Sequence, residues 1–433
     1  MNVRNYLVIA FISLWSLICV TPVAFSEVSP GDVIDSTNWE KAEGLIPRSI
    51  LNWVKKGDWV LEISDLNYDI GEYYADFARE AFEKNRGKYD VGPNNEILHA
   101  GTDQVVESIV GLPFPDIDPN DPKAAVKIMH NNHYMQYIVG DIRANYHLVW
   151  VGRSGFEREV GCRWNQAAMD GWPGALSRGN PDRIEKYATL LVLKPFDVAG
   201  TAVMLWRYLE PHKLDSTFGY IPAVRRVRRM SPASRSDAYI GSDVCVDDAN
   251  GYDGKVTAFE WKFLGMREAI VPWYDKDPLP ILRTEQDEWA TSKEIKKIRH
   301  GYEEEGWRGA PWAATNLTWT KRPVYILEMK PKDRYYNYGT HTMWVDAQTY
   351  SCNYKVICDR SGQYWKTFLK ADIPCESANG RVKILTLGTQ QVVDDRTDHC
   401  TVIEGISPRN SYVYFARVDL NDFTLGGFQK YCK

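Results

Sequence analysis

Two short clusters in this sequence have the residue types that metal sites use. His130 and His133 stand three residues apart in a helical pattern, so both imidazoles would share one helix face and could hold one ion. No third ligand is evident, and a surface or capping role is favoured. Residues 247–254 offer several carboxylate oxygens to calcium, but their spacing departs from an EF-hand, and an Asp/Gly-rich turn is favoured. The sequence therefore predicts neither a metal ion nor another cofactor.

The most concentrated charge in the chain is Arg-Arg-Val-Arg-Arg at residues 225–229. On a strand, Arg226 and Arg228 share one face, while Arg225 and Arg229 share the other. An internal network of arginines and carboxylates is the favoured interpretation. The alternative is that Arg226 or Arg228 contacts an anionic headgroup or a partner protein.

No catalytic motif is present, whether a nucleophile elbow, a zinc-protease helix, a phosphate-binding loop or a dinucleotide fingerprint. Asp346 and Asp359 lie near aromatic strands, where a pair of carboxylates about 5 to 10 Å apart could hydrolyse a polymer of the cell envelope. The sequence does not give their separation. The prediction is that the protein is not an enzyme.

The composition excludes some function classes and favours a β-rich body. The chain has 433 residues with a net charge of −5, which is too weakly charged for a general nucleic-acid binder. Its 16 Trp and 25 Tyr suit half-buried sheet surfaces better than helix bundles.

Residues 1–26 have the layout of a secretory signal peptide, with cleavage expected after Ser26. An uncleaved membrane anchor and a lipoprotein processed at Cys19 are the alternatives. The prediction is an exported protein in the periplasm of a Gram-negative bacterium, peripheral to the outer membrane at most.

Seven cysteines remain after residue 26. Export permits disulfides, up to three pairs with one thiol left over, and disulfides are favoured over a zinc site because no C-x-x-C pair exists. These cysteines are Cys162, Cys245, Cys352, Cys358, Cys375, Cys400 and Cys432.

The periodicity divides the chain after the signal peptide into two regions. Residues 27–143 are expected to form helices and loops, with helices over 69–87 and 121–140. Residues 144–433 are expected to form one large antiparallel sheet, with a charged helical insertion near 284–300. The candidate strands are 146–152, 188–193, 202–209, 220–229, 256–264, 324–329, 342–345, 353–358, 364–369, 382–387 and 412–418.

Two candidate strands, 202–209 and 325–329, are apolar on both faces. Such a strand is either covered on both sides or lines an apolar concavity, and periodicity does not choose between them. If a cavity exists, the candidate wall residues are Trp206, Phe259, Trp261, Phe263, Leu327 and Trp365.

Several blocks, taken together, are similar to a known family. In chain order they are residues 111–115, 218–229, 250–254, 261–265 with 271–272, 344–346 and 359–365. They resemble the bacterial exported family known as domain of unknown function 1329. The resemblance is collinear and spans most of the chain after residue 26.

The resemblance implies a fold like that of the periplasmic lipoprotein carriers of the Lol type. This is a mainly β (α+β) protein with a large, strongly curved antiparallel half-barrel, whose concave side is covered by N-terminal helices. It also implies a hydrophobic cargo such as a lipid, acyl chain or lipidated protein. The partners it implies are a resistance-nodulation-division exporter and an outer-membrane β-barrel.

The leading hypothesis is therefore a periplasmic carrier or accessory protein. A non-catalytic envelope-binding or scaffold module, with exposed Trp rings as platforms, is the second hypothesis. An exported hydrolase is the third.

Overall fold

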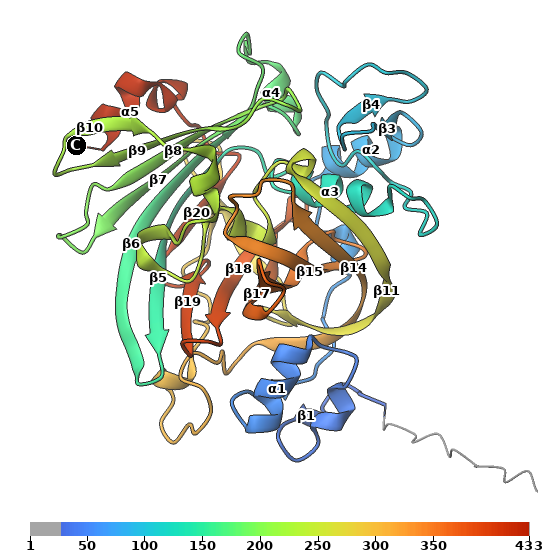
Figure 1. Cartoon of the computed structure of the whole chain (residues 1–433), viewed down its shortest axis with the longest axis vertical. Helices are drawn as coiled ribbons and strands as arrows, with labels where there is room; N and C mark the ends of the chain where they lie inside the picture. Colours follow the sequence, from blue (N-terminus) through green and yellow to red (C-terminus); the bar gives the residue numbers. More distant parts are fainter. Residues whose placement is uncertain (1–26, 433) are drawn as a thin grey trace, which may run out of the picture.

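The computed structural model describes residues 27–432, so the predicted signal peptide and Cys19 lie outside the described residues. The chain forms a large curved sheet with smaller elements at its ends (Figure 1). Among residues 27–432, none of the helices combines the length and the apolar character that crossing a membrane requires.

The N-terminal region consists of short helices and two small two-stranded sheets, which lie at different ends of the molecule (Figure 1). The first strand of the large sheet begins at Ile142, close to the predicted boundary. The elements are β1 (Val33–Ile34), α1 (Arg48–Lys56), β2 (Leu61–Glu62), α2 (Asp76–Lys84), β3 (Tyr89–Val91), β4 (Ile97–His99) and α3 (Ala124–Tyr134).

The large sheet has 16 strands and is almost entirely antiparallel, which confirms the predicted fold class. Its strands are β5 (Ile142–Gly152), β6 (Gly155–Ala168), β7 (Ile184–Lys194), β8 (Ala202–Tyr208), β9 (Ser216–Ile221), β10 (Arg226–Arg229), β11 (Phe259–Trp273), β12 (Leu279–Arg283), β13 (Trp289–Thr291), β14 (Thr318–Pro331), β15 (Tyr338–Asp346), β16 (Cys352–Asp359), β17 (Tyr364–Ser377), β18 (Lys383–Asp394), β19 (His399–Glu404) and β20 (Ser411–Tyr414). Two further helices are α4 (Pro173–Leu176) and α5 (Leu425–Tyr431).

The two halves of this sheet end differently. In one half, β11, β14, β15, β16 and β17 follow one another by antiparallel pairing, and a parallel pair between Trp273 and Asp372 joins β11 back to β17. In the other half, β5 to β10 form an open run of antiparallel hairpins that ends at β10. The open half therefore ends in a strand, β10, that has a partner on one side only.

The predicted covering of the concave side by N-terminal helices is not confirmed. Helix α3 is almost wholly buried and contacts β11, but α1 lies at the far end of the molecule beside β1 (Figure 1). Residues 230–254, which we call the inner segment, instead lie between the two halves. Its 3-10 helix η5 (Val246–Gly251) contacts β16 and β17, and its Tyr239 and Val246 face the open half.

One predicted strand and one predicted helix are wrong. Residues 220–229 form the hairpin β9–β10, because Pro222 lacks a backbone donor and Arg225 adopts a φ of 50° in the turn. Residues 284–300 contain strand β13 and no helix. Trp289 and Ala290 pair with both β12 and β20, so sheet pairing overrides the helical charge pattern.

The predicted helices are shorter than their patterns. Asp69, at the start of the predicted helix over 69–87, accepts a hydrogen bond from the Gly71 amide, but it starts only the 3-10 turn η2 (Ile70–Glu72), and α2 begins at Asp76. Helix α3 ends at Tyr134, and turns follow it to Gly140.

The predicted disulfides are absent from the structure: all seven cysteines of the described residues are free thiols. Six are buried, where an unpaired cysteine packs as a small hydrophobic side chain, and Cys358 is half-buried. Burial also raises the pKa of the Cys162 and Cys352 thiols to about 12, which keeps them protonated and unreactive.

A thiol count under non-reducing conditions tests this arrangement. For the chain starting at residue 27, we expect Cys358 alone to react readily with a thiol reagent in the native state. All seven thiols should react after denaturation. A denatured count of one to five would show that disulfides form.

Candidate functional site

A cavity of about 490 Å³ lies between strands β8–β10 and the inner segment. We call it the edge cavity, because β10 is the last strand of the open half. This volume is within the range of about 300 to 1,000 Å³ that is usual for small-molecule sites. Its apolar walls include Ala202, Val203, Ile221, Val224, Met230 and Ile240.

Strand β8 is apolar on both faces, and its two faces have different surroundings. Met204 packs with Phe428 of α5 on one face. Val203 and Leu205 point to the other face, toward the inner segment. One face of β8 is therefore covered by other elements, and the other face lines a cavity.

A smaller cavity of about 90 Å³, which we call the inner cavity, adjoins the edge cavity. The two share Val203, Tyr239 and Val246 in their walls. The inner one is bordered by Leu148 and Ile403, on the strands deeper in the sheet. Apolar cavity walls therefore extend from the sheet edge to β5 and β19.

Arginines line the edge cavity beside these apolar groups. Arg226 and Arg228 are exposed side chains of β10, and both border the cavity, while Val227 between them packs toward α5. Arg229 donates from Nη2 to Ser216 Oγ at 3.1 Å. Within residues 27–432 neither Arg226 nor Arg228 forms an ion pair, so the internal network favoured for this stretch is not found there.

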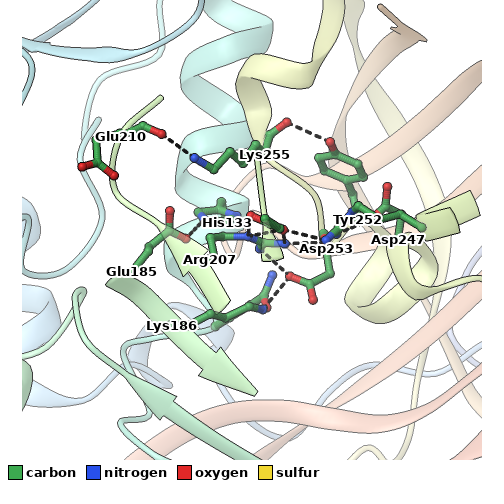
Figure 2. Close-up of polar contacts among 12 residues, drawn as sticks. His133, Glu185, Lys186, Arg207, Glu210, Asp247, Tyr252, Asp253 and Lys255 are labelled. Atoms are coloured by element: carbon green, nitrogen blue, oxygen red, sulfur yellow. Dashed lines mark hydrogen bonds and ion pairs between the residues drawn. The ribbon is translucent and has the colours of Figure 1, made fainter. Parts of the chain in front are cut away.

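An internal network does exist, but it is built on other arginines (Figure 2). Arg207 of β8 is fully buried, and its guanidinium lies 2.9 Å from Asp215 and 2.8 Å from Asp253. Lys186 of β7, also fully buried, lies 2.6 Å from Asp253. These pairs attach the inner segment, which contains Asp253, to the open half of the sheet.

Arg235 extends this network between two cavities. It lies 2.6 Å from Asp215 and also pairs with Asp247. It borders the edge cavity on one side and, on the other, a second cavity of about 400 Å³ whose walls include Tyr252 and Phe259. The inner segment therefore divides the hollow of the sheet and leaves open space on both sides.

The carboxylates of residues 247–254 form ion pairs with lysine and arginine side chains. The structure therefore agrees better with an Asp/Gly-rich turn than with a calcium site. Asp248 pairs with Lys355 at 2.6 Å, while Asp247 and Asp253 belong to the network above. Burial alone would raise the pKa of Asp253, but the charges of Lys186 and Arg207 hold it well below its usual range.

The two histidines of α3 are buried, so the surface role favoured for them is wrong. His130 Nε2 lies 2.7 Å from the Asn95 carbonyl oxygen, and burial lowers its pKa to about 4. His133 Nε2 lies 2.5 Å from Glu185 Oε1, to which the Tyr137 hydroxyl also donates. No group of three or more His, Cys, Asp or Glu side chains in residues 27–432 could hold a metal ion.

Three of the predicted wall residues lie in packed surroundings. Trp206 is on the face of β8 that packs against the C-terminal elements, and its indole donates to the Phe423 carbonyl at 2.8 Å. Leu327 is fully buried in the main core. Phe259 is buried but borders the second cavity.

The other three predicted wall residues are half-buried at the edge of the main core. The Trp261 indole donates to the Val256 carbonyl at 2.8 Å, and the Trp365 indole donates to Asp394 at 2.7 Å. Phe263 packs edge-on against Tyr325. Of the residues predicted for the site, Arg226 and Arg228 lie together at the edge cavity, and Phe259 lies at the second cavity. The other five predicted wall residues border neither of these two cavities.

The two carboxylates considered for hydrolysis are each bound within a turn. Asp346 is fully buried, lies 2.8 Å from Arg322 and accepts the amide of Thr349. Asp359 accepts the Ser361 hydroxyl at 2.7 Å and pairs with Arg396. Both carboxylates therefore stabilise the turns in which they lie.

Several solved structures are similar to this one at low sequence identity. A domain from Vibrio parahaemolyticus, described as an outer-membrane lipoprotein-sorting protein, has 15% identity and a TM-score of 0.48, and the match covers 71% of this chain and all of that one. A DUF1329 family protein from Desulfovibrio piger has 16% identity and a TM-score of 0.47, over 71% of this chain and 98% of that one. A LolA superfamily protein from Nitrosomonas europaea has 12% identity and a TM-score of 0.39, over 69% and 97%.

The sequence matches no curated protein. It does match one family model, described as protein of unknown function (DUF1329), over residues 33–424. That match includes all the strands of the large sheet, the inner segment and the residues around both cavities. The chain therefore belongs to the DUF1329 family.

Proposed function

We propose that this protein binds a hydrophobic ligand in the edge cavity and acts as a carrier or accessory protein of the cell envelope. The observation that carries the proposal is the cavity itself, an apolar space of about 490 Å³ bordered by β8–β10 and the inner segment. A lipid, an acyl chain or the lipid part of a lipidated protein has the matching chemistry.

The energy of such binding is adequate for a carrier. Each methylene group that leaves water contributes about 0.8 kcal/mol, so about ten buried carbons contribute roughly 8 kcal/mol before ordering costs are subtracted. The binding free energy that remains after these costs is smaller, which allows capture of the ligand and its release when a partner competes for it.

The proposed location and partners rest on the sequence. The signal-peptide layout of residues 1–26 supports export to the periplasm. The family resemblance supports a resistance-nodulation-division exporter and an outer-membrane β-barrel as its partners. Affinity purification from cells that express the protein under its own leader would identify both partners and the compartment.

Binding is tested with a fluorescent fatty-acid probe and a variant that fills the cavity. Val203 borders both the edge cavity and the inner cavity, so Val203→Phe places an aromatic ring in space that the ligand would fill. We expect the wild type to take up the probe and Val203→Phe to bind it at least about tenfold more weakly, which corresponds to about 1.4 kcal/mol. Titration of probe fluorescence gives both dissociation constants.

The matched control is Val33→Phe, which adds the same ring to a valine on β1 that is 49% exposed. This control should bind the probe as the wild type does. Mass spectrometry of extracts from protein purified out of the periplasm should show a co-purified hydrophobic molecule. Empty protein that takes up no probe would refute the proposal.

A further inference from the structure

We propose that the ligand of the edge cavity is a single-chain amphiphile with an anionic headgroup. Arg226 and Arg228 bind the headgroup, and the chain lies in the apolar part of the cavity. This inference rests on the function proposed above and specifies its ligand class.

The first argument is the unmatched positive charge at the cavity. Of the four arginines in its wall, Arg235 is neutralised by Asp215 and Asp247, and Arg229 is held by Ser216. Arg226, Arg228 and Arg229 have no carboxylate partner among residues 27–432, and of these three only Arg229 is held by a hydroxyl group.

One acidic residue, Asp237, also borders the edge cavity. It accepts a hydrogen bond from the Asn337 amide at 2.7 Å and forms no ion pair within the described part of the chain. The local charge therefore stays positive, and an oxyanion is the complementary group.

The second argument is the apolar surface next to these arginines. Ile221 is 54% exposed and Val224 is 44% exposed, and both border the cavity in the β9–β10 hairpin. Large apolar side chains grouped at a cavity mouth mark a place where a ligand contacts the protein. Charge and apolar surface thus meet at the same mouth, as an amphiphile requires.

The third argument is the order in which the groups occur along the cavity. Arg226 and Arg228 are on the outermost strand, whereas Val203 borders both cavities and Leu148 borders only the inner cavity. A ligand placed with its head at β10 would direct its chain toward β5. The inner cavity, at about 90 Å³, has room for no more than the end of one chain.

A sulfate, phosphate or carboxylate headgroup would use the same guanidinium hydrogen bonds. Inorganic phosphate offers this chemistry without a chain, so it distinguishes an amphiphile site from a simple anion site. We therefore compare four probes of known structure: dodecyl phosphate, dodecanol, dodecyltrimethylammonium and inorganic phosphate.

The experiment measures binding of these probes by calorimetry to the wild type, to Arg226→Gln/Arg228→Gln and to Arg225→Gln. The wild type should bind dodecyl phosphate at least about tenfold more tightly than dodecanol, which is the expected effect of one charged hydrogen bond. The double variant should lose this preference and retain the affinity for dodecanol. Arg225→Gln should behave as the wild type, because Arg225 is an exposed turn residue outside the cavity wall.

The outcomes separate this inference from the proposed function. Equal affinity for dodecanol and dodecyl phosphate, or a double variant that keeps the preference, overturns the headgroup assignment and leaves a hydrophobic site in place. Binding of inorganic phosphate as tight as that of dodecyl phosphate overturns the amphiphile assignment. Failure of all three dodecyl probes refutes the proposed function as well. A thermal melt of each variant confirms that it folds.

Discussion

Replacing Arg207 by methionine should lower the free energy of unfolding by about 3–5 kcal/mol, the usual effect of removing one partner from a buried ion pair. Arg207 is fully buried, and it lies within 3 Å of both Asp215 and Asp253. Methionine fills a similar volume but leaves these two buried carboxylates short of positive charge. Urea unfolding of both proteins at neutral pH measures the difference.

The control for this prediction is Arg153→Met. Arg153 lies 2.6 Å from Asp398, but its side chain is 82% exposed, and surface pairs of this kind contribute about 0 to 1 kcal/mol. Equal effects of Arg207→Met and Arg153→Met would contradict a structural role for the buried network. In Arg207→Met the inner segment should be held less firmly against the sheet, so residues 230–254 should become sensitive to proteases.

Replacing His341 by phenylalanine should make the protein less sensitive to acid. His341 is 1% exposed, and its ring packs against Phe259, Tyr336 and Tyr338. Neither of its ring nitrogens has a hydrogen-bond partner among residues 27–432. Burial, reinforced by the charge of Lys355, lowers its pKa to about 3. Phenylalanine suits these aromatic neighbours and carries no proton.

The direction of the pH effect follows from the two pKa values of His341. Its pKa is about 3 in the folded protein against 6.5 in the unfolded chain, so between these values the unfolded state binds more protons. The contribution to stability is complete above pH 6.5 and falls as the pH falls. Between pH 6.5 and pH 4 the wild type should lose about 3 kcal/mol more than His341→Phe.

Unfolding curves at a series of pH values test this expectation. His99→Phe, at an exposed position on β4, removes a different imidazole and leaves the buried one in place. Its stability should depend on pH as that of the wild type does. Parallel pH profiles for the wild type and His341→Phe would contradict the assignment.

The sequence predicted the sheet well where strands have local signals. Runs such as 146–152 and 364–369 are rich in β-branched and aromatic residues, and they lie within β5 and β17. The helix over 284–300 failed because its charge pattern is local, whereas the pairing of β13 with β20 joins residues more than a hundred positions apart. Local sequence periodicity cannot predict a pairing between such distant residues.

The candidate site was only partly visible in the sequence. Arg226 and Arg228 were identified because alternation on a strand places them on one face, and both border the edge cavity. Val203 was missed, although the apolar character of both faces of its strand was the available signal. The inner segment has no periodic pattern, and its place is set by ion pairs such as Lys186 with Asp253, which are 67 positions apart.

The position of β10 at one margin of the large sheet has a consequence for self-association. An unpaired margin exposes backbone amides and carbonyls, to which a strand of a second copy can add. Three of the four residues of β10 are arginines, so two such margins repel each other. Solutions of Arg226→Gln/Arg228→Gln should therefore form aggregates at lower concentration than the wild type, and light scattering would record the onset.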